Sequence, residues 1–151
     1  MRLLDQRRVT YEPFYYDPAI HSAVEVAEAL GVPADRVYKT LVMLRGRGRP
    51  LLVMVPGSTE VDPRRLAQSL GEKSVQMAPK RDAERLTGLL VGGIGALALL
   101  HKPFEVCIDR AALAHDWILV NGGRRGVNLK IAVKDLIDLT RARPVEAAAG
   151  P

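Results

Sequence analysis

The sequence predicts a single α+β domain, with a mixed, twisted sheet or partial barrel flanked by helices. A chain of 151 residues with 48% hydrophobic content is long enough to bury one real core and too short for two independent domains. Its predicted strands are connected both by tight turns and by helices, which is typical of α+β domains. No internal repeat or linker is visible. We therefore expect one domain over residues 1–143 and a disordered tail over 144–151.

The N-terminal third changes from a two-residue to a helical period. Residues 10–16 are rich in aromatic side chains and predict a strand, which Asp17-Pro18 ends because proline fixes φ. Apolar residues then recur at helical spacing over 23–30. Ser22 is the expected N-cap of this helix and Gly31 its C-terminal cap.

Two strongly apolar segments, 37–44 and 51–55, predict the centre of the sheet. Both carry apolar side chains on both faces, as interior strands do, and the glycines and proline of 46–50 predict a turn between them. Asp62-Pro63 then has the form of an N-cap followed by proline at the first helical position. A helix is expected from there to about residue 69, with Gly71 closing it.

The remaining elements follow from the same signals. They are a strand over 74–77, a helix over 79–86 with Gly88 as its cap, a glycine-rich loop over 90–95, a strand over 104–108, strands over 117–120 and 127–131 joined by a hairpin connection over 121–126, and a helix over 133–140. From residue 143 onward the sequence resembles a frayed tail.

Composition narrows the classes of function. No run of about 18 apolar residues is present and residues 1–10 are charged, so we expect a cytoplasmic protein without a membrane partner. Cys107 is the single cysteine and is expected in the core, and the three histidines are scattered; neither a metal site nor a cofactor is expected. The net charge is +5, with basic residues in short clusters that either attract RNA or form a solvated surface.

Lys39 is the most unusual residue of the sequence because it interrupts an apolar central strand. Burying an ammonium without a partner costs roughly several kcal/mol of folding free energy. Lys39 therefore needs a partner, an open cleft or a shifted pKa. In a cleft it would hold a carbonyl or a phosphate, or act as a weak acid. The alternative is a lysine whose stem covers the core while its ammonium reaches water. Thr40 points to the opposite face of the same strand.

Two glycine-containing segments are further candidates for a site. Gly92, Gly93 and Gly95 would let backbone N–H groups approach a ligand, although a plain flexible turn has the same composition. Arg124 and Arg125 lie at the tip of the expected hairpin, where guanidinium groups either contact tRNA phosphates or remain in solvent. No serine–histidine–aspartate arrangement or pair of carboxylates suggests another catalytic centre.

Four fragments together carry a resemblance to a known family. They are VYKTLV (37–42), LLVGGIG (89–95), VNGGRRGVNLKI (120–131) and KDLIDL (134–139). In this order and spacing they resemble the YbaK family of Cys-tRNA(Pro) deacylases, relatives of the editing insertion of prolyl-tRNA synthetases. The likeness extends from about residue 11 to about residue 139.

The resemblance implies a function and a set of site residues. It implies a trans-editing hydrolase that deacylates Cys-tRNA(Pro), with tRNA(Pro) and prolyl-tRNA synthetase as partners; the oligomeric state stays open. Lys39 would be the essential catalytic lysine. The implied substrate-binding residues are Phe14, Tyr16, Thr40, Gly92, Gly93, Ile94, Gly95 and Asn128. Deacylation of Ala- or Ser-tRNA, or a noncatalytic module that binds tRNA or a synthetase, are the alternatives.

The sequence departs from the family pattern at several positions. The glycine loop continues Gly93-Ile94-Gly95-Ala96, whereas typical members have Gly-Ile-Ser-Pro there. Phe14 stands where the family has a tyrosine, unless the register shifts to the adjacent Tyr15 or Tyr16, and Asn128 stands where close relatives have an aspartate. The N-terminal helix is shortened or absent. These departures concern the amino-acid specificity more than the fold.

Overall fold

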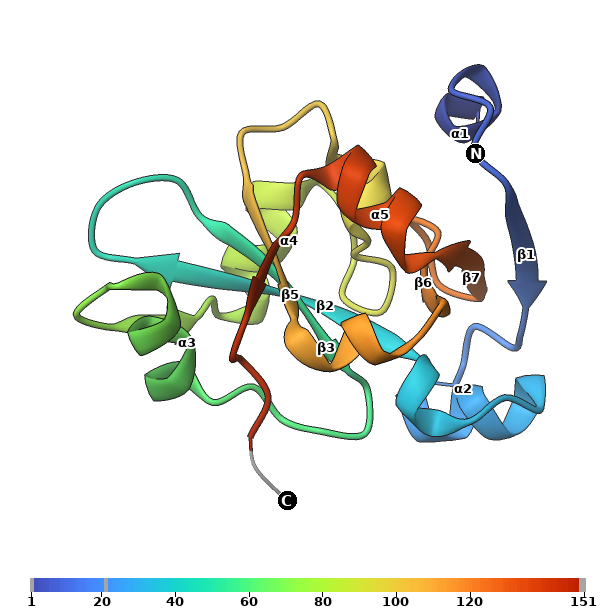
Figure 1. The fold of residues 1–151 in the computed structure, drawn as a ribbon, viewed down its shortest axis with the longest axis horizontal. Helices are drawn as coiled ribbons and strands as arrows, with labels where there is room; N and C mark the ends of the chain where they lie inside the picture. Colours follow the sequence, from blue (N-terminus) through green and yellow to red (C-terminus); the bar gives the residue numbers. More distant parts are fainter. Residues whose placement is uncertain (1, 21, 150–151) are drawn as a thin grey trace.

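The computed structural model describes residues 2–20 and 22–149, in which helices pack around two β-sheets (Figure 1). The α-helices are α1 (Arg2–Gln6), α2 (Ala23–Leu30), α3 (Pro63–Leu70), α4 (Lys80–Thr87) and α5 (Val133–Thr140), and short 3-10 helices are η1 (Ala34–Arg36), η2 (Ala96–Leu99) and η3 (Arg110–Ala114). The strands are β1 (Tyr11–Tyr15), β2 (Tyr38–Arg45), β3 (Leu51–Pro56), β4 (Val75–Met77), β5 (Glu105–Asp109), β6 (Trp117–Asn121), β7 (Val127–Ala132) and β8 (Arg143–Val145).

The strands form one mixed and one antiparallel sheet. The five-stranded sheet has the order β4-β2-β3-β5-β8, antiparallel from β4 to β3 and parallel from β3 to β8. The three-stranded sheet has the order β1-β7-β6. A parallel bridge between Val37 and Leu119 connects the start of β2 to β6. The α+β prediction is thus confirmed, but the strands are divided between two sheets that do not close into a barrel.

The predicted helix caps are confirmed where the sequence placed them. The Ser22 hydroxyl accepts a hydrogen bond from the backbone N–H of Glu25, and the Asp62 carboxylate accepts from Arg64 and Arg65. Gly31 and Gly71 end their helices in the left-handed conformation, with φ of 68° and 72°. These local signals therefore fix where α2 and α3 begin and end.

Strand β2 divides the core into two layers, as its apolar sequence predicted. Its even-numbered side chains, such as Tyr38 and Val42, pack between the two sheets with the inward faces of β6 and β7. Its odd-numbered side chains, such as Met43, pack with β3 residues under α3. Strand β3 is buried along its whole length, and Cys107 of the adjacent β5 is fully buried, as expected for a core cysteine.

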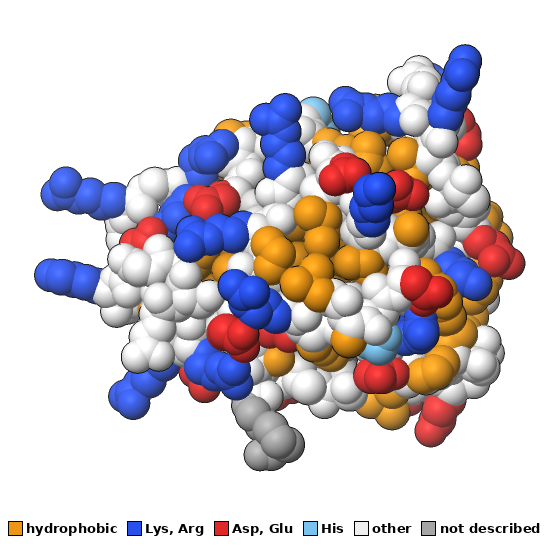
Figure 2. All heavy atoms as spheres, viewed as in Figure 1, with side chains coloured by type: hydrophobic (Ala, Val, Ile, Leu, Met, Phe, Trp, Pro, Cys, Tyr) orange, Lys and Arg blue, Asp and Glu red, His pale blue; other side chains and the backbone are white. Residues whose placement is uncertain are grey.

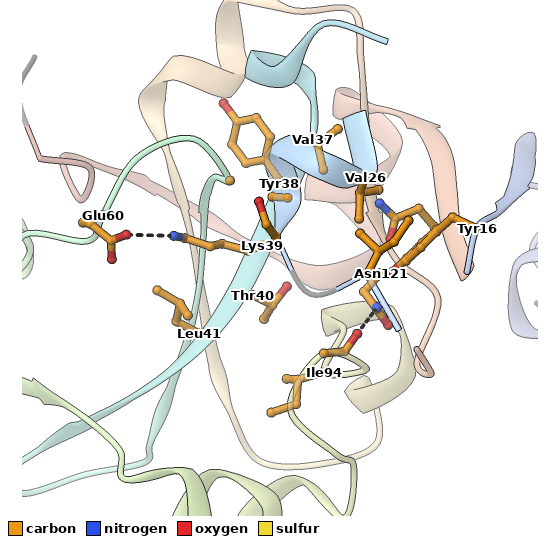
Figure 3. Close-up of a pocket in the computed structure, with 16 residues that line it drawn as sticks. Tyr16, Val26, Val37, Tyr38, Lys39, Thr40, Leu41, Glu60, Ile94 and Asn121 are labelled. Atoms are coloured by element: carbon orange, nitrogen blue, oxygen red, sulfur yellow. Dashed lines mark hydrogen bonds and ion pairs between the residues drawn. The ribbon is translucent and has the colours of Figure 1, made fainter. Parts of the chain in front are cut away.

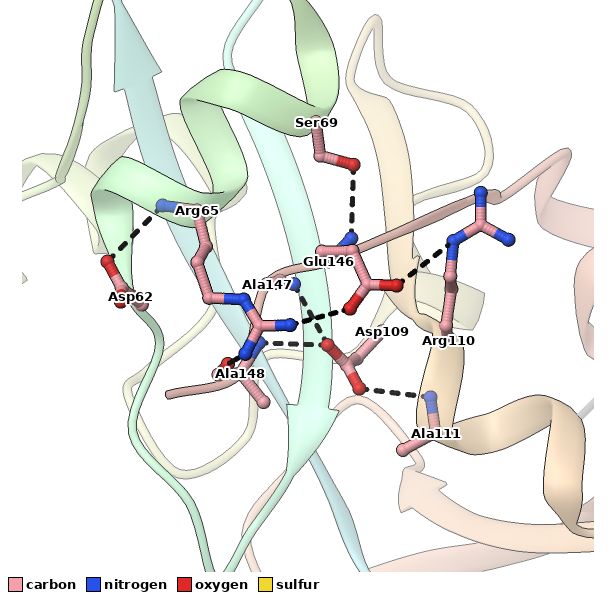
Figure 4. Close-up of polar contacts among 9 residues, drawn as sticks. All are labelled: Asp62, Arg65, Ser69, Asp109, Arg110, Ala111, Glu146, Ala147 and Ala148. Carbon is pink, nitrogen blue, oxygen red and sulfur yellow. Dashed lines mark hydrogen bonds and ion pairs between the residues drawn. The ribbon is translucent and has the colours of Figure 1, made fainter. Parts of the chain in front are cut away.

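The expected disordered tail over 144–151 is wrong for the residues that the structure describes. Residues 143–145 form β8, which pairs in parallel with β5, and the chain stays ordered through residue 149. Figure 4 shows the reason: the buried Asp109 carboxylate accepts hydrogen bonds from the backbone N–H groups of Ala147 (2.9 Å) and Ala148 (2.8 Å). Glu146 adds ion pairs to Arg65 and Arg110. Gly150 and Pro151 lie outside the described residues.

The N-terminal helix is short, in agreement with the expectation of a reduced one. α1 contains five residues, of which Leu4 is buried in the core between the sheets. Because a helix this short is marginal in isolation, its stability depends on that buried side chain. Within the described residues, no helix has the length and apolar character needed to cross a membrane.

Candidate functional site

A pocket of about 380 Å³ lies where the start of β2 meets the three-stranded sheet (Figure 3). Its walls come from β2, the N-terminal part of α2, the loop after β3, the glycine loop before η2, and the ends of β6 and β7. The described side chains and backbone that line it include Tyr16, Tyr38, Lys39, Thr40, Glu60, Gly92, Ile94, Asn121 and Asn128.

Lys39 lies in the wall of this pocket. Its side chain is 27% exposed, and its Nζ is 3.8 Å from Glu60 Oε1. Lys39 pairs with Val55 across the β2–β3 ladder. Glu60 lies in the loop that follows β3, close after Val55 in the sequence, and this places its carboxylate near Lys39. Lys39 therefore lines the cleft with a partly exposed side chain, and its ammonium has a carboxylate partner.

Thr40 points away from Lys39, as the alternation of a strand requires (Figure 3). It still lines the pocket, because the pocket extends around the start of β2. Within the described ranges, the buried hydroxyl of Thr40 has no hydrogen-bond partner, and the same is true of the Tyr38 hydroxyl. Burial, with smaller effects from Asp109 and Asp35, raises the pKa of Tyr38, so its hydroxyl stays protonated.

The glycine loop is held against the β6–β7 hairpin by close backbone packing. A Cβ atom at Gly95 would collide with the carbonyl oxygen of Asn121, and one at Gly93 would lie 2.9 Å from the Cα of Arg124. Gly92 has φ of 95° and lines the pocket together with Ile94. Gly93 and Gly95 are therefore packing positions, whereas Gly92 and Ile94 face the pocket.

Asn121 fixes the loop and was missed by the sequence analysis. Its Nδ2 donates a hydrogen bond to the carbonyl of Gly92 (2.8 Å), and its Oδ1 accepts one from the backbone N–H of Gly123 (2.6 Å). The Arg125 Nε donates to the carbonyl of Val91 at 2.8 Å. This loop has no Ser-Pro sequence to stiffen it; the bonds to Gly92 and Val91 hold it to the hairpin instead, and the bond from Gly123 orients Asn121. The only sequence signal for Asn121 was its place before two glycines.

The structure places some of the other predicted residues in the pocket and others outside it. Tyr16 and Asn128 line the pocket, and Asn128 is only 5% exposed. Burial raises the pKa of Tyr16, partly opposed by a hydrogen bond from the Gly126 backbone. Phe14 pairs with Asn128 in the β1–β7 ladder but packs against the core under α2. Arg124 and Arg125 are exposed beside the glycine loop and do not line the pocket.

The charges of the pocket limit its chemistry. Among its described lining residues, Lys39 is the one cation and Glu60 the one carboxylate. No cluster of three or more potential metal-binding side chains occurs in the described ranges. An ammonium can polarise a carbonyl or hold a phosphate oxygen, and a carboxylate can accept hydrogen bonds from a substrate ammonium. The pocket therefore suits a zwitterion-like substrate end with one electron-rich and one cationic group.

Solved structures share this fold closely. The crystal structure of a putative trans-editing enzyme for prolyl tRNA synthetase superposes with a TM-score of 0.82 at 22% identity, covering 97% of this chain and 92% of that one. The crystal structure of hypothetical protein APE2540 gives a TM-score of 0.88 at 24% identity, covering 98% and 97% of the two chains. At these identities the likeness concerns the fold.

Sequence relatives give the family. The "Putative Cys-tRNA(Pro)/Cys-tRNA(Cys) deacylase EbsC" of Enterococcus faecalis is 32% identical over 148 residues, which are 97% of this chain and 90% of that protein. A proline--tRNA ligase of Nitratidesulfovibrio vulgaris is 31% identical over 132 residues, 87% of this chain but 22% of the ligase, so the chain spans about a fifth of that relative. The family model described as "Aminoacyl-tRNA editing domain" matches residues 17–139. The chain therefore belongs to the aminoacyl-tRNA editing domain family.

Proposed function

We propose that this protein is a trans-editing deacylase that hydrolyses the aminoacyl ester of mischarged tRNA, with Cys-tRNA(Pro) as its first substrate. The observation that carries the proposal is the position of Lys39, which lines the same pocket as Gly92 and faces Glu60. The family supports the reaction class, and the relative named as a Cys-tRNA(Pro)/Cys-tRNA(Cys) deacylase supports the amino acid.

The two charged groups of the pocket match the two ends of an aminoacyl ester. The Lys39 ammonium would donate to the ester carbonyl oxygen, where negative charge develops during attack. The Glu60 carboxylate, 3.8 Å away in the absence of substrate, would accept from the substrate's α-ammonium group. Because the ester is already reactive, positioning and charge stabilisation can supply most of the acceleration. Lys39 is thus the proposed catalytic residue and Glu60 a substrate-binding residue.

Cysteine fits a pocket that supplies no strong nucleophile of its own. Among the described lining residues there is no cysteine or histidine, and the Ser22 hydroxyl already accepts a hydrogen bond as the cap of α2. The substrate's own thiol can attack its ester carbon, releasing the tRNA 3′ oxygen with the thiol proton and leaving a cyclic thioester that water opens. Cysteine and proline are nearly equal in volume, so a synthetase cannot separate them by size and a second site must remove the error.

Partners and location follow from the substrate as part of the same proposal. The protein would act in the cytoplasm, where aminoacyl-tRNA is found, and prolyl-tRNA synthetase would select the tRNA. The relatives that contain this domain inside a proline--tRNA ligase support such a pairing. If selection is delegated, the isolated protein should deacylate cysteine from several tRNAs at similar rates, and the synthetase should restrict it to tRNA(Pro).

A deacylation panel tests the proposal. Purified protein is incubated with Cys-tRNA(Pro), Ala-tRNA(Pro), Ser-tRNA(Pro) and Pro-tRNA(Pro), and the remaining ester is measured over time. We expect Cys-tRNA(Pro) to be hydrolysed fastest and Pro-tRNA(Pro) to be spared. Faster hydrolysis of the alanyl or seryl ester would show that alanine or serine, and not cysteine, is the preferred amino acid. RNA binding without turnover of any ester would indicate a noncatalytic module.

Lys39→Ala is the decisive variant in that panel. We expect it to lower single-turnover hydrolysis by about 100-fold or more, the usual effect of removing one donor to a developing oxyanion. Lys80→Ala is the matched control, because Lys80 is an exposed lysine of α4 outside the pocket. Equal rates for Lys39→Ala, Lys80→Ala and the unmodified protein would remove the role given to Lys39.

A further inference from the structure

A second hollow, separate from the pocket, collects four cationic side chains from four distant parts of the sequence. It has a volume of about 450 Å³. Arg7 follows α1, Arg49 ends the β2–β3 turn, Lys102 precedes β5, and Arg141 follows α5. In Figure 2 lysine and arginine side chains stand along the upper edge of the molecule, the side on which Figure 1 shows α1 and the end of α5. We call this feature the basic hollow.

The cations of the basic hollow are not neutralised within the described part of the chain. None of the four forms an ion pair with a described carboxylate. The one carboxylate in the lining, Glu105, is bonded to the guanidinium of Arg45. Four cations against one carboxylate leave a lining charge of +3, out of +5 for the whole chain. Such a concentration of like charge attracts a polyanion.

The groove beside α3 is a second basic cluster, and it is partly compensated. It contains Arg64, Arg65 and Lys73; Arg65 pairs with Glu146, whereas Glu72 of the lining pairs with Arg45, as Glu105 of the basic hollow does. The basic hollow differs because its cations have no such partners and converge on one concave surface. This contrast makes it the stronger candidate for an anion.

The basic hollow also contains apolar side chains, which narrows the ligand further. Leu100 and the ring of Phe104 are partly exposed in its lining, whereas Leu99 and Val106 are buried. Basic side chains beside an exposed aromatic or aliphatic surface are the combination that holds the phosphates and unstacked bases of single-stranded nucleic acid. A protein partner of acidic character would not need these apolar side chains.

Neighbouring residues of one connecting segment, 92–99, line the pocket and the basic hollow. Gly92 and Ile94 line the pocket, whereas Ala96 and Leu99 line the basic hollow. Five residues separate Ile94 from Leu99, so these two walls are at most about 17 Å apart, and closer because η2 is helical. A ligand chain of a few nucleotides could therefore reach from one to the other.

We propose that the basic hollow binds the phosphates and an unpaired base of the single-stranded 3′ end of tRNA, while the aminoacyl group enters the pocket. The identity of the RNA rests on the proposed function, but RNA binding itself can be tested without turnover. The contacts are to backbone and base faces and not to base edges, so they would fix the strand without reading its sequence.

The test compares two triple variants of equal charge. Arg7→Gln/Arg49→Gln/Lys102→Gln removes three cations of the basic hollow, and Arg64→Gln/Lys73→Gln/Lys80→Gln removes three exposed cations elsewhere. Affinity for uncharged tRNA(Pro) is measured over a series of salt concentrations. We expect the first variant to bind about tenfold or more weakly, with the salt slope reduced by about 2, and the control to change little.

Two further RNA probes separate the possible outcomes. Removing the unpaired 3′ nucleotides of the tRNA should weaken binding to the unmodified protein and abolish the difference between the two triple variants. AMP at the same concentration should not compete; competition would indicate a site for a free nucleotide and overturn the proposal. Equal losses in both triple variants would indicate diffuse attraction and overturn it as well. The proposal would also be overturned if the basic-hollow variant kept its RNA affinity but lost binding to prolyl-tRNA synthetase.

Failure of the proposed function would remain distinguishable. If the unmodified protein bound the 3′ end through the basic hollow but hydrolysed no ester, the hollow would stand and the deacylase would not. If Lys39→Ala abolished turnover while the basic-hollow variant bound and deacylated tRNA normally, the deacylase would stand and RNA binding by the basic hollow would not.

Discussion

The pocket and the basic hollow are lined by consecutive parts of the segment 92–99, yet they carry different charges. The pocket has one cation and one carboxylate within ion-pair distance, and its surroundings are constrained by hydrogen bonds to the glycine loop. The basic hollow has four cations without carboxylate partners in the described ranges, on residues that are mostly exposed. A balanced pair suits recognition of a small substrate end, whereas a surplus of one sign suits a long polyanion.

The comparison teaches that binding and chemistry can be separated on this scaffold. Changes in the pocket should alter turnover and amino-acid preference at constant RNA affinity. Changes in the basic hollow should alter RNA affinity and its salt dependence at constant turnover of bound substrate. Only substitutions in the connecting segment, residues 92–99, should affect both RNA affinity and turnover.

The largest loss of stability is expected from Gly95→Ala, a change in the connecting segment 92–99. Because a Cβ atom there would collide with the Asn121 carbonyl oxygen, the loop must move away from the hairpin. We expect a loss of about 1–3 kcal/mol in unfolding free energy, together with reduced hydrolysis. Denaturant titration and single-turnover rates measure both. Gly46→Ala is the control, since nothing lies within 4 Å of a Cβ at Gly46; equal stability of the two variants would contradict the tight packing.

Glu60→Gln should change only the pocket. We expect kcat/KM for Cys-tRNA(Pro) to fall about tenfold, because the substrate α-ammonium loses a charged acceptor. An N-acetylated substrate has no ammonium group, so its hydrolysis should be almost unchanged by the substitution. Glu28→Gln, on the exposed face of α2, controls for the change in net charge. An equal loss with both substrates would mean that Glu60 acts through Lys39 instead.

Arg141→Asn should change only the basic hollow. Arg141 has φ of 56°, a conformation that asparagine adopts more readily than most residues, so the backbone should tolerate the change. We expect tRNA to bind about threefold more weakly, with a salt slope lower by about 1. Arg47→Asn removes an equal charge from the β2–β3 turn and should have less effect. A lower rate for bound substrate would show that the two regions are coupled.

Thr40→Val should have the smallest effect and should separate stability from binding. Its hydroxyl is buried without a partner in the described ranges, so its removal should leave stability unchanged or raise it by about 1 kcal/mol. If substrate uses that hydroxyl, KM should rise a few-fold. Thr87→Val is the control, because the Thr87 hydroxyl donates to the Ala83 carbonyl at 2.8 Å and its loss should destabilise. Equal losses of stability in Thr40→Val and Thr87→Val would contradict the expected difference between a hydroxyl without a partner and a hydrogen-bonded one.

Local signals were sufficient to predict most of the fold. The interior strands followed from their apolar faces, and α2, α3 and α4 begin or end at caps that the sequence placed correctly. The separation into two sheets was missed, because it depends on which strands pair over long distances, such as β1 with β7. β8 was missed because its sequence carries a proline and small residues, and its stability comes from Asp109, over 30 residues away.

The site was predictable only in part, for the same reason. Lys39 and the glycines were visible as exceptions to a local pattern. Glu60 was not, since it lies in a loop and meets Lys39 only through the register of β2 and β3. A hairpin alignment of 37–44 with 51–56 would have placed the chain after Val55 beside Lys39. The basic hollow joins residues 7 and 141, which no local pattern relates.

The ordered C-terminal segment has a consequence for how the site is assembled. The backbone of Ala147 accepts a hydrogen bond from Asp62, and Ala149 donates one to Glu60, so residues 147–149 fasten the loop whose carboxylate faces Lys39. A chain shortened at residue 143, beyond the last recognisable family fragment, would keep every residue of the pocket. It would nevertheless lose both hydrogen bonds that hold the loop at Glu60 and Asp62. The carboxylate proposed to bind the substrate's ammonium group would then no longer be fixed beside Lys39.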